Sequence, residues 1–279
     1  MPPTAPKPPK DDRPLIEARD LSVRFGRQPV LRQINLSVPR GQTLVVIGES
    51  GCGKTVLLKS LIGLVRPTQG TVVFDGQNLA ALNDRELARQ RIRFGFVFQG
   101  AALFDSLTVA QNVAFPLRQQ AEYDDARIRR AVLDRLADVG LPENILYKKP
   151  AELSGGMRKR VGLARAQIMS PEVILYDEPT TGLDPIMSAV INELILRTRN
   201  RIPVTNVVVT HDMQTVAKVA DRVVMLHPLS RLKGDEPQVI FDGKPADLER
   251  SPDPRVRQFV RGEAGERLME MGERQTAAT

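Results

Sequence analysis

The chain of 279 residues has no tryptophan, one cysteine and two histidines. A single cysteine cannot form an internal disulfide, so nothing in the sequence indicates an oxidising compartment. The longest apolar stretches, 44–47 and 173–176, are far shorter than the roughly 18–20 residues that a membrane-spanning helix needs. The N-terminal segment lacks the apolar region of a secretory signal. Together these absences predict a cytoplasmic protein.

Basic residues exceed acidic ones, which gives a formal net charge of +7 and an isoelectric point near 9.8. Such a balance can reflect a nucleic-acid surface, proximity to anionic lipid headgroups or only a solvated surface. Aromatic residues make up 4% of the chain and do not alternate with Lys and Arg in a base-stacking pattern. We therefore expect no nucleic-acid partner.

The chain divides into segments of different character. Residues 1–14 are rich in proline and predict a flexible arm. Residues 101–170 show helical spacing and few strand-like runs. The predicted elements are strands from residue 16 and at 43–47, 173–176, 204–210 and 222–226, and helices around 56–62, 128–139 and 155–168. An α/β core interrupted by a helical insertion is the simplest account of this order.

One segment matches the phosphate-binding pattern G-x-x-x-x-G-K-[ST] and lies between a predicted strand and a predicted helix. Backbone N–H groups around such a loop form an anion cradle, to which the helix N-terminus adds its positive dipole end. The lysine supplies charge to the β- and γ-phosphates, and the threonine hydroxyl is a ligand suited to Mg²⁺. The residues are Gly48, Glu49, Ser50, Gly51, Cys52, Gly53, Lys54 and Thr55.

Polar residues follow two other predicted strands. Asp177 and Glu178 end the strand at 173–176, and His211 ends the strand at 204–210. Ligands of α/β proteins bind at the carboxyl ends of the strands, so we expect these side chains near the phosphate loop. There Asp177 is placed to hold Mg²⁺, Glu178 to accept a proton from water and His211 to contact the γ-phosphate. His227 has no comparable setting and is interpreted as structural.

A second anion site is predicted at the start of the helix at 155–168. Ser154 can cap this helix, and Gly155 and Gly156 leave its backbone N–H groups bare. One nucleotide does not need both this anion site and the phosphate loop. The second anion site is explained if two chains meet head to tail and each completes the nucleotide site of the other.

In this order the motifs resemble the nucleotide-binding subunit of ABC transporters, over about residues 15–250. The resemblance adds Phe25 as the aromatic that stacks on adenine, Gln99 as the Q-loop and Asp184 within the D-loop. It implies an α/β fold: a P-loop NTPase (RecA-like) core with an antiparallel β subdomain and a helical subdomain inserted at about 101–170.

The resemblance also implies a mechanism. ATP binding closes a homodimer in which each nucleotide lies between the phosphate loop of one chain and Ser154 and Gly156 of the other, and hydrolysis reopens it. The implied roles are catalysis by Lys54, Gln99, Glu178 and His211, magnesium binding by Thr55, Gln99 and Asp177, and ATP contacts by Phe25, residues 48–55, residues 154–156 and Asp184. Separate integral-membrane permease subunits would carry the cargo.

Segments at 98–105, 112–117, 182–186 and 252–259 are similar to those of the ATPase of Mla-type phospholipid transporters, which include toluene-tolerance systems. That similarity implies a role in outer-membrane lipid asymmetry, at the cytoplasmic face of the inner membrane. The implied partners are a permease dimer, an MCE-domain lipid-binding protein and in some systems a STAS-domain protein. The alternative is the ATPase subunit of an importer for another small molecule, such as an amino acid.

Three further features lead to expectations. The segment 227–240 lengthens what is usually a tight hairpin, and we expect no effect on the ATP site. The phosphate cradle and Lys54 should lower the thiol pKa of Cys52, so that alkylation blocks ATP binding and ATP protects the thiol. In the tail at 251–279, Asp253 and Pro254 start a short helix. Its apolar face either clamps a partner chain or packs on its own domain.

Overall fold

The computed structural model describes residues 13–120 and 123–263. The predicted N-terminal arm, apart from Arg13 and Pro14, and the predicted tail beyond residue 263 lie outside the described residues. No helix in the described ranges is long and apolar enough to cross a membrane.

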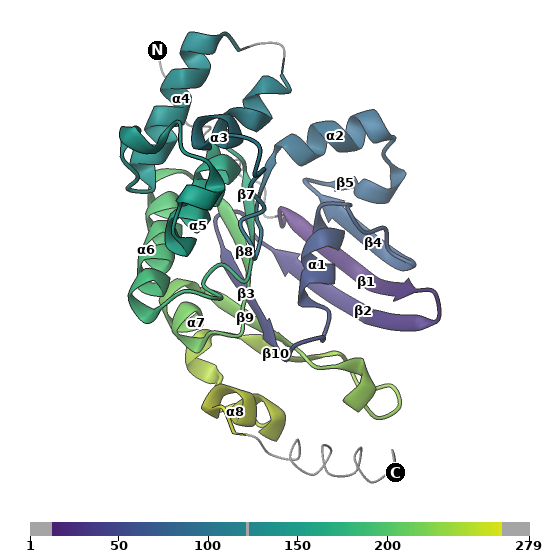
Figure 1. Ribbon diagram of the computed structural model, residues 1–279. Coiled ribbons are helices and arrows are strands. Elements are labelled where there is room, and N and C mark those ends of the chain that lie inside the picture. The colour runs from purple at the N-terminus through teal and green to yellow at the C-terminus, as the bar shows by residue number, and fades with distance from the viewer. Residues whose placement is uncertain (1–12, 121–122, 264–279) are drawn as a thin grey trace, which may run out of the picture.

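A six-stranded sheet forms the centre of the molecule (Figure 1). Its order is β10 (Val239–Gly243), β9 (Arg222–Leu226), β3 (Thr43–Gly48), β8 (Thr205–Val209), β7 (Val173–Asp177) and β6 (Phe94–Val97). Neighbouring strands pair in parallel except for β10, which is an antiparallel edge. Every residue of β3, β7 and β8 is buried, which explains their continuous apolar sequences because both faces of a parallel sheet are covered.

A second, four-stranded sheet is antiparallel and lies beside the first (Figure 1). Its order is β2 (Gln28–Val38), β1 (Ile16–Phe25), β4 (Gln69–Phe74) and β5 (Gln77–Asn78). Buried and more accessible residues alternate along much of β1 and β2, as expected for strands with one face on the core.

The helices lie on both faces of the six-stranded sheet (Figure 1). They are α1 (Lys54–Leu61), α2 (Asp84–Ile92), α3 (Val109–Arg118), α4 (Asp125–Asp138), α5 (Gly155–Gln167), α6 (Pro185–Arg201), α7 (Met213–Val219) and α8 (Pro254–Arg261). Helices α3, α4 and α5 fall between β6 and β7 in the chain and gather at one end of the molecule. Ser154 caps α5, Asp184 caps α6 and Asp253 caps α8.

Alternate residues of β3 point into two separate hydrophobic cores. Leu44 and Val46 pack with α1 and the four-stranded sheet, whereas Val45 and Ile47 pack with the helices of the opposite face. The strand is therefore held from both sides, and the loop that follows Gly48 starts from a rigid point. The prediction of an α/β core is confirmed.

Candidate nucleotide-binding site

The loop 48–53 connects β3 to α1 and takes conformations that need glycine. Gly53, at the N-terminus of α1, has a φ of 99°. A Cβ atom there would lie 2.7 Å from Leu31 Cδ2 and 2.9 Å from the Val30 carbonyl oxygen. At Gly48 a Cβ atom would lie 2.3 Å from the Leu226 carbonyl oxygen. The glycines thus let the loop lie against its neighbours while its N–H groups line a cavity of about 1290 Å³.

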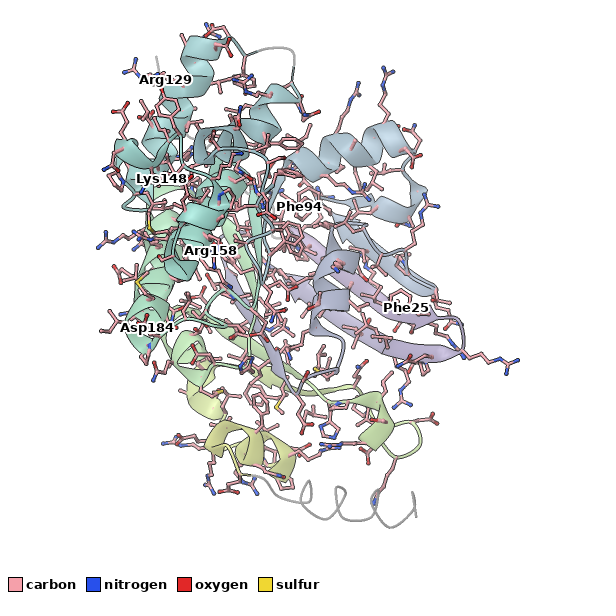
Figure 2. All side chains as sticks on the ribbon, in the orientation of Figure 1. Phe25, Phe94, Arg129, Lys148, Arg158 and Asp184 are labelled. Carbon is pink, nitrogen blue, oxygen red and sulfur yellow. The ribbon has the colours of Figure 1, made fainter. Side chains whose placement is uncertain are left out.

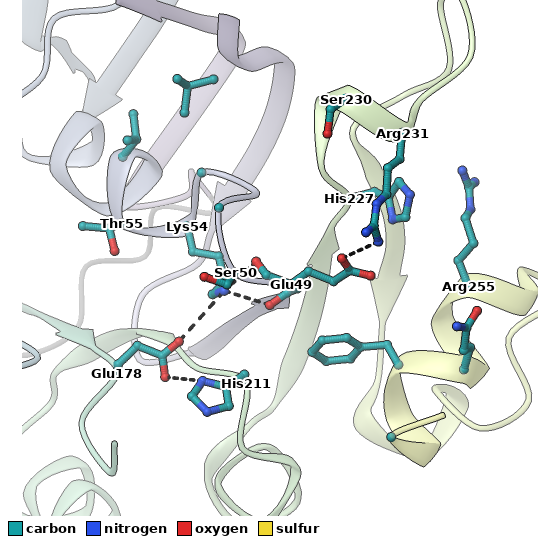
Figure 3. A pocket seen from close by; sticks show the side chains of 18 of the residues that line it. Glu49, Ser50, Lys54, Thr55, Glu178, His211, His227, Ser230, Arg231 and Arg255 are labelled. Carbon is teal, nitrogen blue, oxygen red and sulfur yellow. Dashed lines mark hydrogen bonds and ion pairs between the residues drawn. The ribbon is translucent and has the colours of Figure 1, made fainter. Parts of the chain in front are cut away.

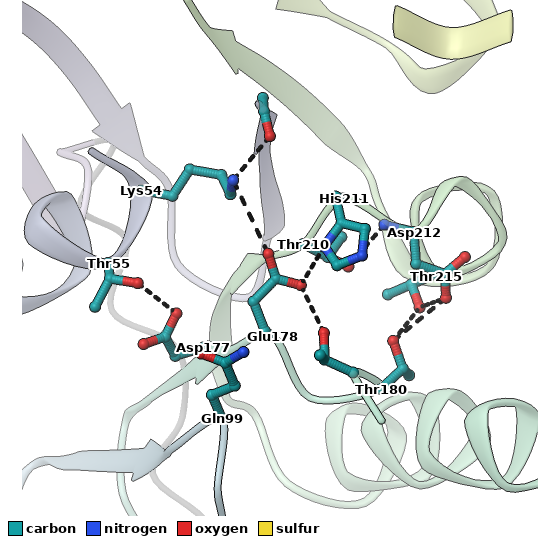
Figure 4. A network of polar contacts seen from close by, with 12 residues as sticks. Lys54, Thr55, Gln99, Asp177, Glu178, Thr180, Thr210, His211, Asp212 and Thr215 are labelled. Carbon is teal, nitrogen blue, oxygen red and sulfur yellow. Dashed lines mark hydrogen bonds and ion pairs between the residues drawn. The ribbon is translucent and has the colours of Figure 1, made fainter. Parts of the chain in front are cut away.

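Lys54 and Thr55 begin α1 and face the cavity. The Lys54 Nζ donates hydrogen bonds to the carbonyl oxygens of Gly48 and Glu49, at 2.7 and 3.0 Å. The Thr55 hydroxyl donates to Asp177 Oδ1 at 2.9 Å (Figure 4). Burial raises the pKa of Asp177, and the Thr55 hydrogen bond partly opposes this effect. The sheet therefore brings together the lysine, hydroxyl and carboxylate that the sequence placed at two different strand ends.

Glu178 is the centre of a polar network (Figure 4). Its carboxylate accepts a hydrogen bond from the Thr181 hydroxyl at 3.0 Å, and it lies 2.9 Å from His211 Nδ1 and 3.9 Å from Lys54 Nζ. The Glu178 residue is 8% exposed, whereas the His211 side chain is 60% exposed. The backbone φ of Glu178 is 49°, a left-handed conformation that non-glycine residues rarely adopt. Backbone strain of this kind is concentrated at functional sites.

The loops carrying Glu178 and His211 are joined behind the site. Asp212 accepts hydrogen bonds from the hydroxyls of Thr215, at 2.7 Å, and Thr180, at 3.3 Å. The same carboxylate caps α7 by accepting from the Gln214 N–H. These contacts set the two strand ends at a fixed separation, so His211 and Glu178 meet without depending on a ligand.

Gln99 follows β6 and lines the cavity. The backbone there is held by Lys159 of α5, whose Nζ donates to the carbonyl oxygens of Gln99 and Glu178. Lys159 is only 7% exposed, and burial lowers its pKa. The sequence does not predict this role of Lys159, because its contacts are with residues far away in the chain. A lysine on a helix rich in basic residues is expected to face solvent.

Other predicted residues do not line this cavity. Ser154, Gly155 and Gly156 lie at the start of α5, next to the start of α6 and the loop before it. A Cβ atom added to Gly156 would lie 2.6 Å from the Met187 side chain, and one added to Gly155 would lie 3.9 Å from the Leu183 side chain. Asp184 begins α6 on this side (Figure 2). Phe25 ends β1 at the hairpin with β2 and is 53% exposed (Figure 2). The structure thus separates these residues from the cavity that Lys54 and Glu178 share.

The prediction of a low pKa for the Cys52 thiol is wrong. Cys52 is 1% exposed, with its sulfur facing the hydrophobic core beneath the loop. Burial raises the pKa of the thiol and outweighs the opposing effect of Lys54. The side chain is a small core residue, and only its backbone belongs to the cradle.

The expectation that residues 227–240 leave the site untouched is also wrong. His227, Ser230, Arg231, Lys233 and Glu236 line the cavity, and Figure 3 shows His227, Ser230 and Arg231 across it from Glu178 and His211. His227, interpreted from the sequence as structural, is 6% exposed, and its Nδ1 has no hydrogen-bond partner among the described residues. Burial, followed by the charge of Arg255, lowers its pKa and favours the neutral imidazole.

Helix α8 adds Arg255, Gln258, Phe259 and the residues just after it to the same wall. Val256 is fully buried in the main core, with Phe259 and Val260 packed against it. The apolar face of α8 therefore packs on its own domain, which is the second of the two predicted alternatives.

The side chains present fit Mg-ATP. A hydroxyl and a carboxylate lie 2.9 Å apart at Thr55 and Asp177, which are the oxygen ligands that Mg²⁺ takes together with phosphate oxygens. Within the described residues no group of three or more His, Cys, Asp or Glu side chains could hold a metal by itself. A metal at this site would take its other ligands from phosphate, amide or water oxygens.

Comparison with known proteins agrees with this geometry. The family model described as ABC transporter matches residues 31–181. The chain belongs to the ABC transporter family. The prediction of an ATPase of the ABC type, with its P-loop NTPase fold, is thereby confirmed.

Individual relatives extend the match. The intermembrane phospholipid transport system ATP-binding protein MlaF of Haemophilus influenzae is 40% identical over 250 residues, which cover 90% of this chain and 91% of that protein. The probable ribonucleotide transport ATP-binding protein mkl of Mycobacterium tuberculosis is also 40% identical, but this chain spans only 66% of its length. The dimeric post-hydrolysis state of the cassette MJ0796, bound to ADP and Pi, aligns with a TM-score of 0.72 and 30% identity over 82% of this chain and 98% of that one.

Proposed function

We propose that this chain is the ATP-hydrolysing subunit of a transporter that moves phospholipid. The observation that carries the proposal is the 40% identity to a phospholipid-transport ATP-binding protein over nine tenths of both chains. The site supports the ATPase part, because the phosphate loop, Thr55 and the Glu178–His211 pair line one cavity, and the Thr55 hydroxyl also contacts the Asp177 carboxylate.

In this proposal the residues of the site have separate roles in ATP hydrolysis. The N–H groups of 48–55 and the Lys54 ammonium hold the phosphates. Thr55, Asp177 and Gln99 would hold Mg²⁺, which supplies positive charge to the β- and γ-phosphates when bound. These groups are preorganised, because the sheet and α1 hold them before any ligand arrives.

Glu178 is proposed as the proton acceptor. Its carboxylate takes a proton from water as the water oxygen bonds to the γ-phosphorus, and the bond from that phosphorus to the bridging oxygen breaks with its electrons leaving on ADP. His211 Nδ1 lies 2.9 Å from Glu178 Oε2 and so can orient the carboxylate. His211 is itself largely exposed, which leaves it accessible to the γ-phosphate.

The remaining predicted residues are proposed to act across a homodimer. Ser154, Gly155, Gly156 and Asp184 do not line the cavity of their own chain, and this supports a role for them at the cavity of a second chain. The dimeric state of the MJ0796 cassette supports this arrangement. Phe25 is proposed to stack on adenine, because its exposed ring is available to a ligand.

The proposed partners are integral-membrane permease subunits, an MCE-domain lipid-binding protein and a STAS-domain protein, with the ATPase at the cytoplasmic face of the inner membrane. A second candidate function, transport of a small molecule such as a ribonucleotide, is favoured by the equal identity to the mycobacterial protein. It is weaker because about a third of that relative has no counterpart in this chain.

The two candidates separate in a mild-detergent pull-down from native membranes, with mass spectrometry of proteins and lipids and a tag-only preparation as the control. We expect a permease, an MCE-domain protein and phospholipid enriched over the control. A permease recovered with a solute-binding protein, and without phospholipid enrichment, would replace the lipid cargo by the small-molecule one.

A further inference from the structure

The segment 227–238 between β9 and β10, called here the hairpin insertion, forms a wall of the nucleotide cavity that the site motifs do not account for. It begins at His227, directly after the strand next to β3, and passes alongside the phosphate loop. In Figure 3 Arg231 and His227 lie on one side of Glu49, while Lys54 and Glu178 lie on the other. The insertion is thus placed to act on the loop from the side opposite the catalytic carboxylate.

The hairpin insertion is anchored at several points. The Gln238 side chain is 1% exposed, donates to the carbonyl oxygens of Cys52, at 3.0 Å, and Val30, at 3.1 Å, and accepts from the Arg32 N–H. The Arg32 guanidinium donates to the Gly234 carbonyl oxygen at 2.9 Å. The insertion is therefore tied directly to the phosphate loop and to β2, which gives its side chains defined positions.

Arg231 of this anchored insertion pairs with the phosphate loop. Its Nη1 lies 2.7 Å from Glu49 Oε2, and the two side chains are 27% and 19% exposed. Glu49 stands between Gly48 and Ser50, within the loop whose N–H groups form the anion cradle. Without this guanidinium the negative charge of Glu49 would repel a polyphosphate more strongly, and partial burial makes the repulsion stronger than in water.

We propose that Arg231 is a positioning residue of the nucleotide site, which strengthens Mg-ATP binding by holding and neutralising Glu49 of the phosphate loop. The inference rests on the proposed ATP-binding function of the loop. It requires no contact between the arginine and the nucleotide: the arginine acts through the carboxylate. Removing the carboxylate must then remove the need for the arginine.

The test is a double-mutant cycle on Mg-ATP binding, measured calorimetrically in a Glu178→Gln background so that turnover does not interfere. Arg231→Ala should weaken binding about tenfold, and the loss should shrink as salt screens the uncovered carboxylate. Glu49→Gln should bind at least as well as its parent, and Arg231→Ala with Glu49→Gln should match Glu49→Gln alone. Arg231→Lys should recover part of the affinity, because the ammonium keeps the charge but not the fork geometry.

Two controls make the result decisive. Arg250→Ala removes an exposed cation outside the cavity and should change nothing. Lys54→Ala should abolish binding; normal binding by that variant would refute the proposed nucleotide site itself. If Lys54→Ala fails to bind while Arg231→Ala, folded by its melting temperature, binds normally, the inference on Arg231 alone is overturned. It is equally overturned if the double variant binds as weakly as Arg231→Ala, because the arginine would then act on the nucleotide directly.

Discussion

At the scale of single residues, the most informative side chain is Glu178. Its buried carboxylate accepts a hydrogen bond from Thr181 and lies near His211 and Lys54, and its backbone is held in a left-handed conformation. The residue also lines the cavity. The arrangement is that of a group kept ready to accept a proton.

Replacement of Glu178 by Gln should lower ATP turnover by at least about 100-fold and leave Mg-ATP affinity within a few-fold of the parent. The amide keeps the shape and the donor contacts but is a poor proton acceptor. Steady-state phosphate release and equilibrium binding measure the two quantities separately. Turnover near the normal rate would show that another group accepts the proton.

Cys52 allows a test of burial at the loop. Since the thiol pKa is raised and the side chain is inaccessible, the native protein should react with a thiol reagent at neutral pH on the order of 100-fold more slowly than the denatured protein. The reaction should accelerate only at a pH above the ordinary cysteine value. The chain has one cysteine, so the measured labelling reaction reports on Cys52 alone. Rapid stoichiometric labelling of the native protein would contradict the buried position.

At the scale of elements, α8 shows how a short helix can be fixed by its neighbours. Asp253 caps it and pairs with Arg255, which also pairs with Glu236 of the hairpin insertion at 2.9 Å. Val256 inserts into the main core. The helix therefore braces the insertion against the domain, and through it the wall of the nucleotide cavity.

Val256→Ala should lower the free energy of unfolding by about 2 kcal/mol, because two buried methyl groups are lost and a small cavity remains. Arg261→Ala, on an exposed position of the same helix, is the matched control and should cost less than about 0.5 kcal/mol. Denaturant unfolding measures both. Equal stability of the two variants would mean that α8 does not pack on the domain in solution.

At the scale of the whole molecule, the two sheets are joined by an ionic network as well as by apolar packing. Asp75, in the turn after β4, pairs with Arg93, which precedes β6, and with Arg40, which precedes β3. Arg93 and Arg40 also pair with Glu172, which precedes β7. Burial acts to raise the pKa of Asp75, but the hydrogen bonds and charges of Arg93 and Arg40 outweigh it and lower that pKa.

A carboxyl whose pKa is lower in the folded state stabilises the fold above its unfolded pKa, and this contribution is lost as pH falls through the folded value. Asp75→Asn should therefore destabilise the protein by roughly 1 kcal/mol at neutral pH, a modest figure because the pair is partly exposed. The difference from the parent should shrink below about pH 4. Asp134→Asn, at an exposed site on α4, is the control. A difference that stays constant down to acid pH would argue against the ionic origin.

Much of the fold and of the site follows from the sequence alone. The phosphate loop is contiguous, so the spacing of its glycines, Lys54 and Thr55 can be recognised in the sequence alone. The continuous apolar runs at β3, β7 and β8 predict buried parallel strands, and parallel strands place Asp177, Glu178 and His211 at one edge of the sheet.

Only the tertiary structure decided which distant groups meet. Arg231 pairs with Glu49 across 182 positions of sequence, and Lys159 holds the carbonyl oxygens of Gln99 and Glu178. No local sequence pattern predicts these contacts, because the sequence around a polar residue on a loop or a basic helix does not show whether its side chain faces water or a neighbouring residue. Burial likewise reversed the expected pKa of Cys52, since desolvation depends on atoms that the chain brings in from elsewhere.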